Sequence, residues 1–382
     1  MRIFIYLFPA LVNYILGGTF FISAYEFSVA GHGGFVVTCV IAAWALIYSL
    51  TSAAMSKITT EKNAARLIVM AAFGISVSSL IFIIFPGIAG QFIGIAAIGV
   101  TSAVYCAPFQ VFMKDLEPDQ QSGVVRSTAL YTASWSIGMA TGPFVFGLLD
   151  RDSGFIINAL MGLFMAGSIW WIDVKHRKHG IKRHPVTVSN VTAVNYAKMP
   201  DYAWVGWVVA GIGTVAVSLV RTLVPFRANL LGIGKEEAGM ILAVVSYAQA
   251  AMGFLLIRSR YWMYKPGPTL LIGAAGTLAV ILFAFSNTTT PFFIGALLYG
   301  AYSGCIYFYL VFHSLAHSSK SARYVGINET LVGFASVAGA LAGGVVTEVF
   351  NAGTSFMLCA VAILVTACFQ WRIFMMGKVK NR

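Results

Sequence analysis

The sequence predicts an all-α membrane protein whose twelve transmembrane helices form two pseudo-symmetric six-helix bundles. Three observations support this fold: the composition, the spacing of the apolar segments and an internal repeat. Of the 382 residues, 59% are hydrophobic and 10% are charged, whereas a soluble domain carries about 25% charged residues. Because a chain this apolar cannot bury its surface in a core of its own, we expect the lipid bilayer to be its solvent.

Twelve apolar segments follow one another along the chain. A run of about 20 apolar residues is long enough to cross a bilayer as a helix, and a backbone in lipid must satisfy its hydrogen bonds internally. The runs do not alternate between apolar and polar residues as barrel strands would, so we expect helices. They span about residues 3–25, 34–56, 67–86, 88–113, 123–149, 154–173, 203–224, 237–257, 267–286, 290–314, 323–349 and 354–375.

The distribution of basic residues predicts how the chain is oriented. An even number of helices places both termini on one side, and cytoplasmic loops carry an excess of lysine and arginine. Of the 25 such residues, 21 fall on the side of the termini, and only Arg151, Arg221, Arg227 and Lys235 do not. We therefore expect a multi-pass protein of the bacterial cytoplasmic (inner) membrane with both termini in the cytoplasm. The net charge of +12 then requires no nucleic-acid partner.

An internal repeat divides the chain into an N-terminal bundle (1–173), a basic cytoplasmic central loop (174–202) and a C-terminal bundle (203–382). When the sequence is shifted by 201 residues, small residues of the two halves coincide. Two parallel six-helix halves with a binding cavity between them at mid-membrane follow from such a repeat. The coinciding pairs are Gly94 with Gly295, Gly99 with Gly300, Ser102 with Ser303, Gly138 with Gly339, and Gly142 with Gly343.

The whole chain resembles the major facilitator superfamily in its twelve helices, its six-plus-six repeat and its basic central loop. The sharpest local match is the stretch Gly138–Pro143, followed by Gly147. In that family a Gly-Pro motif at this place is associated with exporters and antiporters. The loop at 56–66 departs from the family because it lacks the usual glycine and aspartate. The resemblance implies a secondary active transporter that works by alternating access as a functional monomer.

Arg221 is the main candidate for substrate binding. It lies deep in the helix expected at 203–224, with Thr214 and Ser218 on the same face at helical spacing. An ionisable residue inside a membrane helix is costly and is a functional candidate by default. We expect Arg221 to bind an anionic group of the substrate. The alternative is a structural arginine that pairs with backbone carbonyls or extends toward the interface.

Further candidates lie on helices that the resemblance places around the cavity. Tyr302 and Tyr309 fall near one face of the helix at 290–314, and tyrosine suits aromatic or amphipathic ligands. Interfacial anchoring or helix packing would use the same residues. The remaining substrate-binding candidates are Asn13, Tyr105 and Trp135.

Two pairs of residues are candidates for coupling and gating. Glu329 and His313 are expected to carry protons, since a buried carboxyl can titrate near neutrality; for Glu329 a capping or inter-helix hydrogen bond is the alternative. Glu26 and Arg227 are equivalent under the shift of 201 residues, so they are expected to form an outer gate ion pair. Solvated charges at helix ends would explain them equally well.

Neither a metal nor a cofactor is expected, and the sequence does not indicate an enzyme. His313 and His317 have a metal-ligand spacing but lack a third ligand nearby, and the five cysteines show no CxxC pattern. Aspartate-rich diphosphate motifs, HExxH, GxSxG and a P-loop are absent from the sequence. We expect proton-coupled export of a small anionic or amphipathic organic molecule. The alternatives are uptake of an organic acid or sugar by proton symport, and a sensor without transport, which Arg221 and Glu329 argue against.

Overall fold

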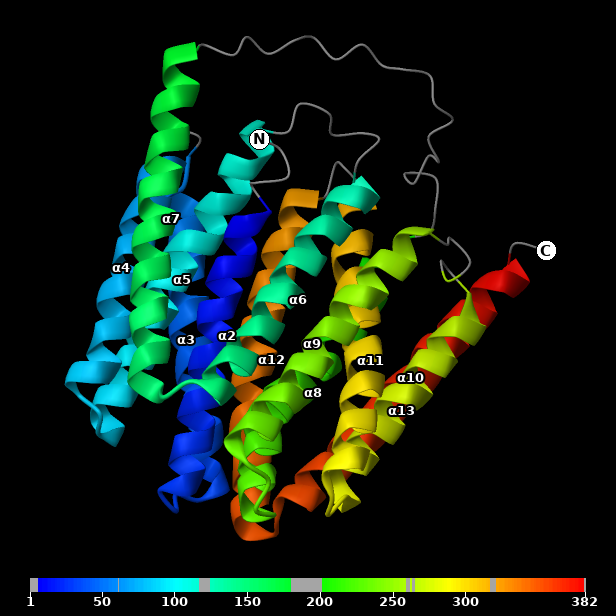
Figure 1. Ribbon diagram of the computed structural model, residues 1–382. Coiled ribbons are helices and arrows are strands. Elements are labelled where there is room, and N and C mark those ends of the chain that lie inside the picture. Colours follow the sequence, from blue (N-terminus) through cyan, green and yellow to red (C-terminus); the bar gives the residue numbers. More distant parts are fainter. Residues whose placement is uncertain are drawn as a thin grey trace.

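The computed structural model describes residues 6–60, 62–116, 124–179, 201–258, 262, 265–316 and 321–380. These residues form twelve α-helices, labelled as in Figure 1. The helices are α2 (Leu7–Val29), α3 (Gly34–Ile58), α4 (Ala64–Ile84), α5 (Ile88–Leu116), α6 (Val124–Leu148), α7 (Arg151–His179), α8 (Ala203–Leu230), α9 (Lys235–Arg258), α10 (Pro266–Phe285), α11 (Thr289–Ala316), α12 (Ser321–Val349) and α13 (Ala352–Lys380).

The twelve-helix prediction is confirmed, and each expected segment corresponds to one helix. Eleven of the helices are long and apolar enough to cross a membrane, as judged from the described residues. The main difference lies at the end of the first half, where α7 continues to His179, past the expected boundary at 173. Most of the expected central loop, residues 180–200, lies outside the described residues. The domain boundaries therefore remain a prediction.

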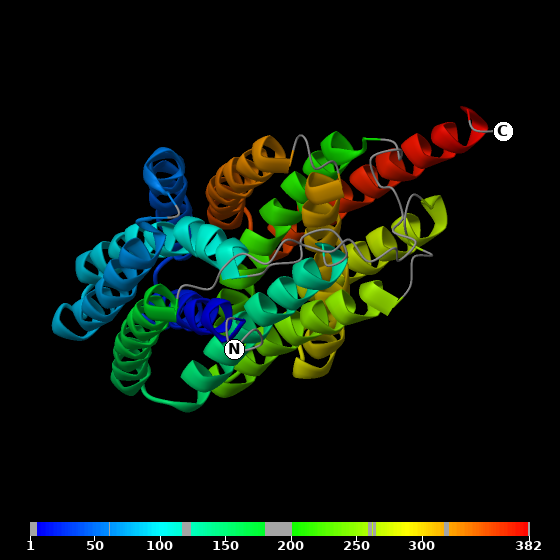
Figure 2. The same ribbon diagram turned by 90° about the horizontal axis from the view of Figure 1, so that it is seen from above.

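The helices are arranged in two halves with matching contacts. Both termini lie at one end of the bundle, called here the termini end, and the opposite end is the distal end (Figure 1). In the first half α2 packs on α6 and α4 packs on α5 and α7; in the second, α8 packs on α12 and α10 packs on α11 and α13. Between the halves, α6 packs on α9, α3 on α12, and α2 on α8. Figure 2 shows the helices from the termini end.

The internal repeat is also seen in the contacts that equivalent glycines make with neighbouring helices. Gly99 of α5 lies against α3, where an added Cβ would stand 3.2 Å from the carbonyl oxygen of Trp44. Gly300 of α11 lies closer still to α9, where an added Cβ would overlap the carbonyl oxygen of Val245, and Trp44 and Val245 are themselves 201 positions apart. The same shift relates the contact of Gly94 with Phe82 to that of Gly295 with Phe283.

Helix α6 is held between two neighbours by close backbone contacts. A Cβ on Gly138 would overlap the carbonyl oxygen of Ala10, and one on Gly142 would overlap the carbonyl oxygen of Tyr14, both on α2. On the other side of α6, a Cβ on Gly239 of α9 would lie 2.5 Å from a carbonyl oxygen of α6. In lipid, small residues drive association because they let backbones approach closely.

The contact between α6 and α2 predicts a stability difference between two glycine positions. Gly138→Ala is expected to destabilise the protein by about 1–3 kcal/mol, since the methyl group meets a backbone atom that cannot move away. Gly167→Ala in α7 is the control, because a Cβ there meets no atom within 4 Å and alanine favours a helix by about 1 kcal/mol. Thermal unfolding of both variants in detergent is the measurement. Equal melting temperatures would contradict the tight packing described for α6.

Candidate functional site

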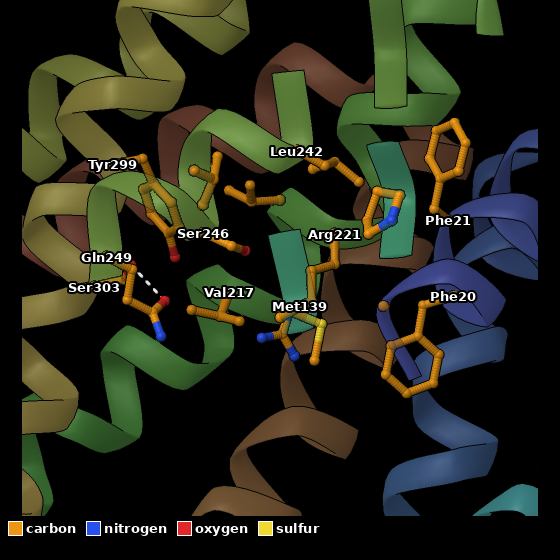
Figure 3. A pocket seen from close by; sticks show the side chains of 14 residues that line it. Phe20, Phe21, Met139, Val217, Arg221, Leu242, Ser246, Gln249, Tyr299 and Ser303 are labelled. Atoms are coloured by element: carbon orange, nitrogen blue, oxygen red, sulfur yellow. Dashed lines mark hydrogen bonds between the residues drawn. The ribbon is translucent and has the colours of Figure 1, made fainter. Parts of the chain in front are cut away.

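A pocket lies between the two halves in the middle of the bundle. The empty space among its lining atoms, including space open to solvent, is about 430 Å³. Helices α2 and α6 line it from the first half, and α8, α9 and α11 line it from the second. Figure 3 shows the lining side chains, which are Gly17, Phe20, Phe21, Met139, Pro143, Val217, Val220, Arg221, Leu242, Val245, Ser246, Gln249, Tyr299 and Ser303.

Arg221 of α8 is the one charged side chain among these fourteen residues. Its guanidinium carbon stands 5.5 Å from the ring centre of Trp135, which belongs to α6 of the other half. Within the described part of the chain it forms neither a hydrogen bond nor an ion pair. The pocket therefore contains a cation without a counter-ion from the described protein groups.

The cost of this arrangement is only partly offset by Trp135. An arginine at the centre of a membrane helix costs about 2.5–3.5 kcal/mol on insertion scales. A cation–π contact contributes about 0.5–2 kcal/mol in return. An anion placed in the pocket would supply the remaining stabilisation.

Two aromatic residues connect Arg221 to the rest of the site. The ring of Trp135 contacts that of Tyr307 on α11, with 5.6 Å between centres. The hydroxyl groups of Tyr307 and Thr214 lie 3.5 Å apart. Of the residues predicted from the sequence, the structure thus places Trp135 against Arg221. Thr214 is linked to them only through Tyr307, and neither Trp135 nor Thr214 lines the pocket. Ser218 does not line the pocket, and its hydroxyl donates to the carbonyl oxygen of Thr214 in its own helix, at 2.8 Å.

A chain of hydrogen bonds forms a polar side of the pocket. The hydroxyl of Ser303 donates to the amide oxygen of Gln249 at 3.0 Å, and the amide nitrogen donates to the hydroxyl of Ser136 across the boundary between the halves at 2.8 Å. The buried hydroxyl of Tyr299 has no hydrogen-bond partner among the described residues. None of these groups was predicted as a site residue. An amide within an apolar stretch is the signal that would have pointed to Gln249.

The two sides of the pocket differ in chemistry. The first half contributes only apolar lining residues, among them Phe20, Phe21 and Met139. Every polar lining side chain comes from the second half: Arg221, Ser246, Gln249, Tyr299 and Ser303. A bound molecule with one polar and one apolar end would therefore take a single orientation.

Residues related by the repeat meet at the distal end. The side-chain amide of Asn229 at the end of α8 donates to the hydroxyl of Ser28 at the end of α2, at 2.9 Å. These positions are 201 residues apart, so they lie beside the pseudo-twofold axis. The Ser28 hydroxyl also donates to the carbonyl oxygen of Phe226 at 3.4 Å. These two hydrogen bonds of Ser28 join the halves at the distal end.

Two further contacts join the halves on either side of this point. The carboxylate of Glu348 in α12 accepts the backbone N–H of Phe35 at the start of α3, at 3.2 Å. The repeat-related contact joins α6 and α9, where the ammonium of Lys235 donates to the carbonyl oxygen of Leu149 at 2.6 Å. An anion thus stands at a helix N-terminus and a cation at a helix C-terminus, both of which suit the helix dipole.

Comparison with known proteins identifies the family. The sequence profile of the Major Facilitator Superfamily matches residues 3–321. This chain belongs to that superfamily. No curated protein sequence matches it.

Solved transporter structures share the fold of this superfamily member. The human organic anion transporter MFSD10 is 12% identical, with a TM-score of 0.64 over 97% of this chain and 99% of its own. The nucleoside transporter NupG is 14% identical, with a TM-score of 0.67 over 98% and 99%. A bacterial homolog of the human lysosomal transporter Spinster, in an inward-facing and occupied conformation, is 12% identical, with a TM-score of 0.68 over 100% and 97%. As a member of the superfamily, the chain is a multi-pass membrane transporter of small molecules and not an enzyme.

Of the eight predicted substrate-binding residues of this transporter, Arg221 alone lines the pocket. Tyr302 lines a separate cavity within the second half, and Tyr309 donates to the carbonyl oxygen of Trp262 at 3.3 Å. Asn13 donates to the carbonyl oxygen of Pro9 in its own helix at 2.8 Å. Tyr105 is buried, with its ring stacked on Phe109 at 5.5 Å.

The two residues predicted to carry protons lie apart from the pocket lining. His313 is buried near the termini end, where its ring contacts those of Tyr309 and Phe312 at 4.9 and 5.2 Å. Glu329 belongs to α12, and its side chain lies outside the described residues. One turn further along that face, Gly333 packs against Ser49 of α3 in the other half. Proton coupling through either residue stays a prediction.

The expected ion pair between Glu26 and Arg227 is absent from this conformation. Glu26 lies 3.7 Å from Arg151 and accepts a hydrogen bond from Gln91 at 3.3 Å, all within the first half. Arg227 donates to the carbonyl oxygen of Ser286 in the second half at 3.2 Å. Each charge thus has a nearer partner in its own half, and the distal contacts above hold the halves together instead.

The distal contacts predict how the halves separate. Glu348→Ala is expected to remove about 1 kcal/mol from the closed distal end, a roughly fivefold gain in open molecules. Glu237→Ala is the control, because Glu237 accepts a hydrogen bond from Thr289 of its own half. Spin labels on Val29→Cys and Leu230→Cys, at exposed distal positions, report the distance in a background without other cysteines. An unchanged distance distribution in Glu348→Ala would contradict a role in closure.

Proposed function

We propose that this transporter exports a small organic molecule that is anionic or amphipathic, by alternating access coupled to protons. The observation that carries the proposal is the Arg221 guanidinium, which lines the pocket between the halves without an anionic partner in the described chain. Ionisable groups at this depth are rare and mark substrate or ion pathways. A carboxylate or phosphate of the substrate would provide the missing charge, in the fork geometry that arginine favours.

The shape and chemistry of the pocket support an amphipathic ligand. Its polar groups all belong to the second half and its first-half lining is apolar, so the anionic end would face Arg221 and the apolar body would contact Phe20 and Phe21. The unpartnered hydroxyl of Tyr299 offers a further hydrogen bond. The likeness to an organic anion transporter agrees with this class, and the likeness to a nucleoside transporter keeps a neutral polar substrate as the competing class.

We infer the orientation from the positive-inside rule. If the termini lie in the cytoplasm of a bacterial cell, the distal end faces outward across the inner membrane. The hydrogen bonds of Ser28 with Asn229 and of Phe35 with Glu348 would then close the outer side, which corresponds to an inward-facing state. Because one chain contributes every lining residue, we propose that the functional unit is a monomer.

Proton coupling and export complete the proposed transport cycle. Glu329 and His313 are the proposed proton carriers, and the Gly-Pro motif at Gly142 and Pro143 favours export by its family association. Uptake of an organic acid or sugar by proton symport is the alternative, since the pocket would bind an anion in either direction.

The role of Arg221 predicts a binding phenotype. Small organic anions are expected to raise the melting temperature of the purified wild type, because a ligand that binds only the folded state stabilises it. Arg221→Ala should weaken anion binding at least tenfold, since a charged hydrogen bond contributes about 1.5–3 kcal/mol. Arg66→Ala, an exposed arginine of α4, is the control and should bind as the wild type does. Equal anion binding by Arg221→Ala would refute the proposal, and selective stabilisation by nucleosides would favour the competing class.

Direction and coupling are tested together in oriented proteoliposomes. Substrate-driven proton flux opposite to the substrate is expected for export by antiport, and flux in the same direction would establish symport instead. Glu329→Gln should abolish the proton flux while leaving substrate binding measurable, because an amide cannot take up the proton. Undiminished coupling in this variant would remove Glu329 from the mechanism.

A further inference from the structure

A second cavity lies wholly within the second half of the bundle. Its empty space is about 830 Å³, including space open to the surroundings, which is larger than the pocket at Arg221. Helices α8, α9, α10, α11 and α13 enclose it. Its lining residues fall into an α10 group of Pro268, Thr269, Leu271, Ile272 and Gly273, an α11 group of Tyr302, Cys305, Ile306 and Tyr309, and an α13 group of Ile363, Thr366, Ala367 and Gln370, with Val209, Met252, Leu256 and Trp262 completing it.

The lining of this cavity is suited to an apolar chain. It contains no charged side chain, and several of its hydroxyl groups already donate to backbone carbonyls. Thr366 donates to Ala362 at 2.7 Å, and Thr269 donates to Lys265 at 3.1 Å. What these helices offer to a guest is therefore mainly aliphatic and aromatic surface, which binds through burial of apolar area.

The cavity reaches the surface that faces lipid. Leu271 lines it and is 71% exposed on α10, whereas Ile363 and Ile306 on the inner side are buried. Trp262, in the segment between α9 and α10, lines it at the termini end. A guest would thus come from the bilayer, from the leaflet at the termini end.

We propose that this cavity binds one acyl chain of an anionic membrane phospholipid. Its lining is apolar and includes the lipid-exposed Leu271, so an acyl chain can enter it from the bilayer. Lys265 precedes α10 and Arg372 lies near the end of α13, so basic residues stand at the end of the bundle where the headgroup would lie. Such residues attract anionic lipid by about 1 kcal/mol each.

The bound chain would lie directly behind the substrate pocket. Tyr302 lines the cavity, and its ring contacts that of Tyr299, 5.8 Å away between centres, which lines the pocket at Arg221. A chain in the cavity would therefore restrict the motion of Tyr302 and, through it, of Tyr299. The acyl-chain site does not depend on the substrate proposed above.

Photolabelling of the full-length protein in nanodiscs tests the site. Phosphatidylglycerol with a diazirine in the middle of one chain is incorporated, and the labelled peptides are mapped by mass spectrometry. Label is expected on buried lining residues such as Cys305, Ile306 and Ile363, in addition to lipid-facing residues such as Val365. Label confined to lipid-facing residues would overturn the proposal. Labelling of the buried residues by a diazirine fatty acid but not by the phospholipid would also overturn it, since the phospholipid would then not be the occupant.

A matched pair of variants tests whether the cavity itself holds the chain. Thr366→Phe places a ring in the cavity, and Leu364→Phe adds the same group on the lipid-facing side of α13, where Leu364 is 44% exposed. Labelling of the Cys305 peptide should fall at least fivefold in Thr366→Phe and stay unchanged in Leu364→Phe. Equal labelling of that peptide in all three proteins would overturn the proposal. The wild-type label map decides by itself if Thr366→Phe fails to fold.

Discussion

The close contact of α6 with α2 and α9 is the constraint on which the rest of the architecture depends. Helices in lipid gain little from excluding water, so they associate through packing and backbone approach. Gly138 and Gly142 allow α6 to touch the backbone of α2, and Gly239 allows α9 to touch α6. The contact of α6 with α2 lies within the first half, and the contact of α9 with α6 joins the two halves. The same helix carries Trp135 to Arg221, so the position of the site follows from this packing.

The internal repeat explains why both halves use the same close contacts between helices. The contact between Gly138 and α2 has its counterpart in Gly339, which lies against Val215 of α8. The distal contacts are paired in the same way, with Glu348 at the start of α3 and Lys235 at the end of α6. The charges are opposite, yet each matches the dipole of the helix end that it meets. Between these contacts, Asn229 binds its own repeat partner Ser28.

The sequence was sufficient for the helices and for one group of the site, and it was insufficient for the rest. Length, apolarity and the shift of 201 residues depend on composition and spacing, so twelve helices in two halves could be predicted. Arg221 was identifiable because a charge in an apolar helix stands out. Tyr299 was not, because spacing along a helix does not reveal which face the packing turns inward. The pairing of Glu26 was missed for a related reason: symmetry indicates equivalent positions, whereas the nearest opposite charge, Arg151, lay in a neighbouring helix.

The chemistry of the pocket shows where the two halves have diverged. Arg221 is equivalent to Phe20 under the shift, and both side chains line the same pocket. One position thus carries a cation in the second half and an aromatic ring in the first. A symmetric scaffold provides two related surfaces that move relative to each other, and such a pair of surfaces would bind a symmetric ligand without preference for orientation. Placing the cation, the amide of Gln249 and the hydroxyls on one side, and Phe20 with Met139 on the other, favours a ligand with distinct ends. In the alternating-access cycle proposed above, the polar end would stay with the second half, and the apolar end would be the one whose contacts change.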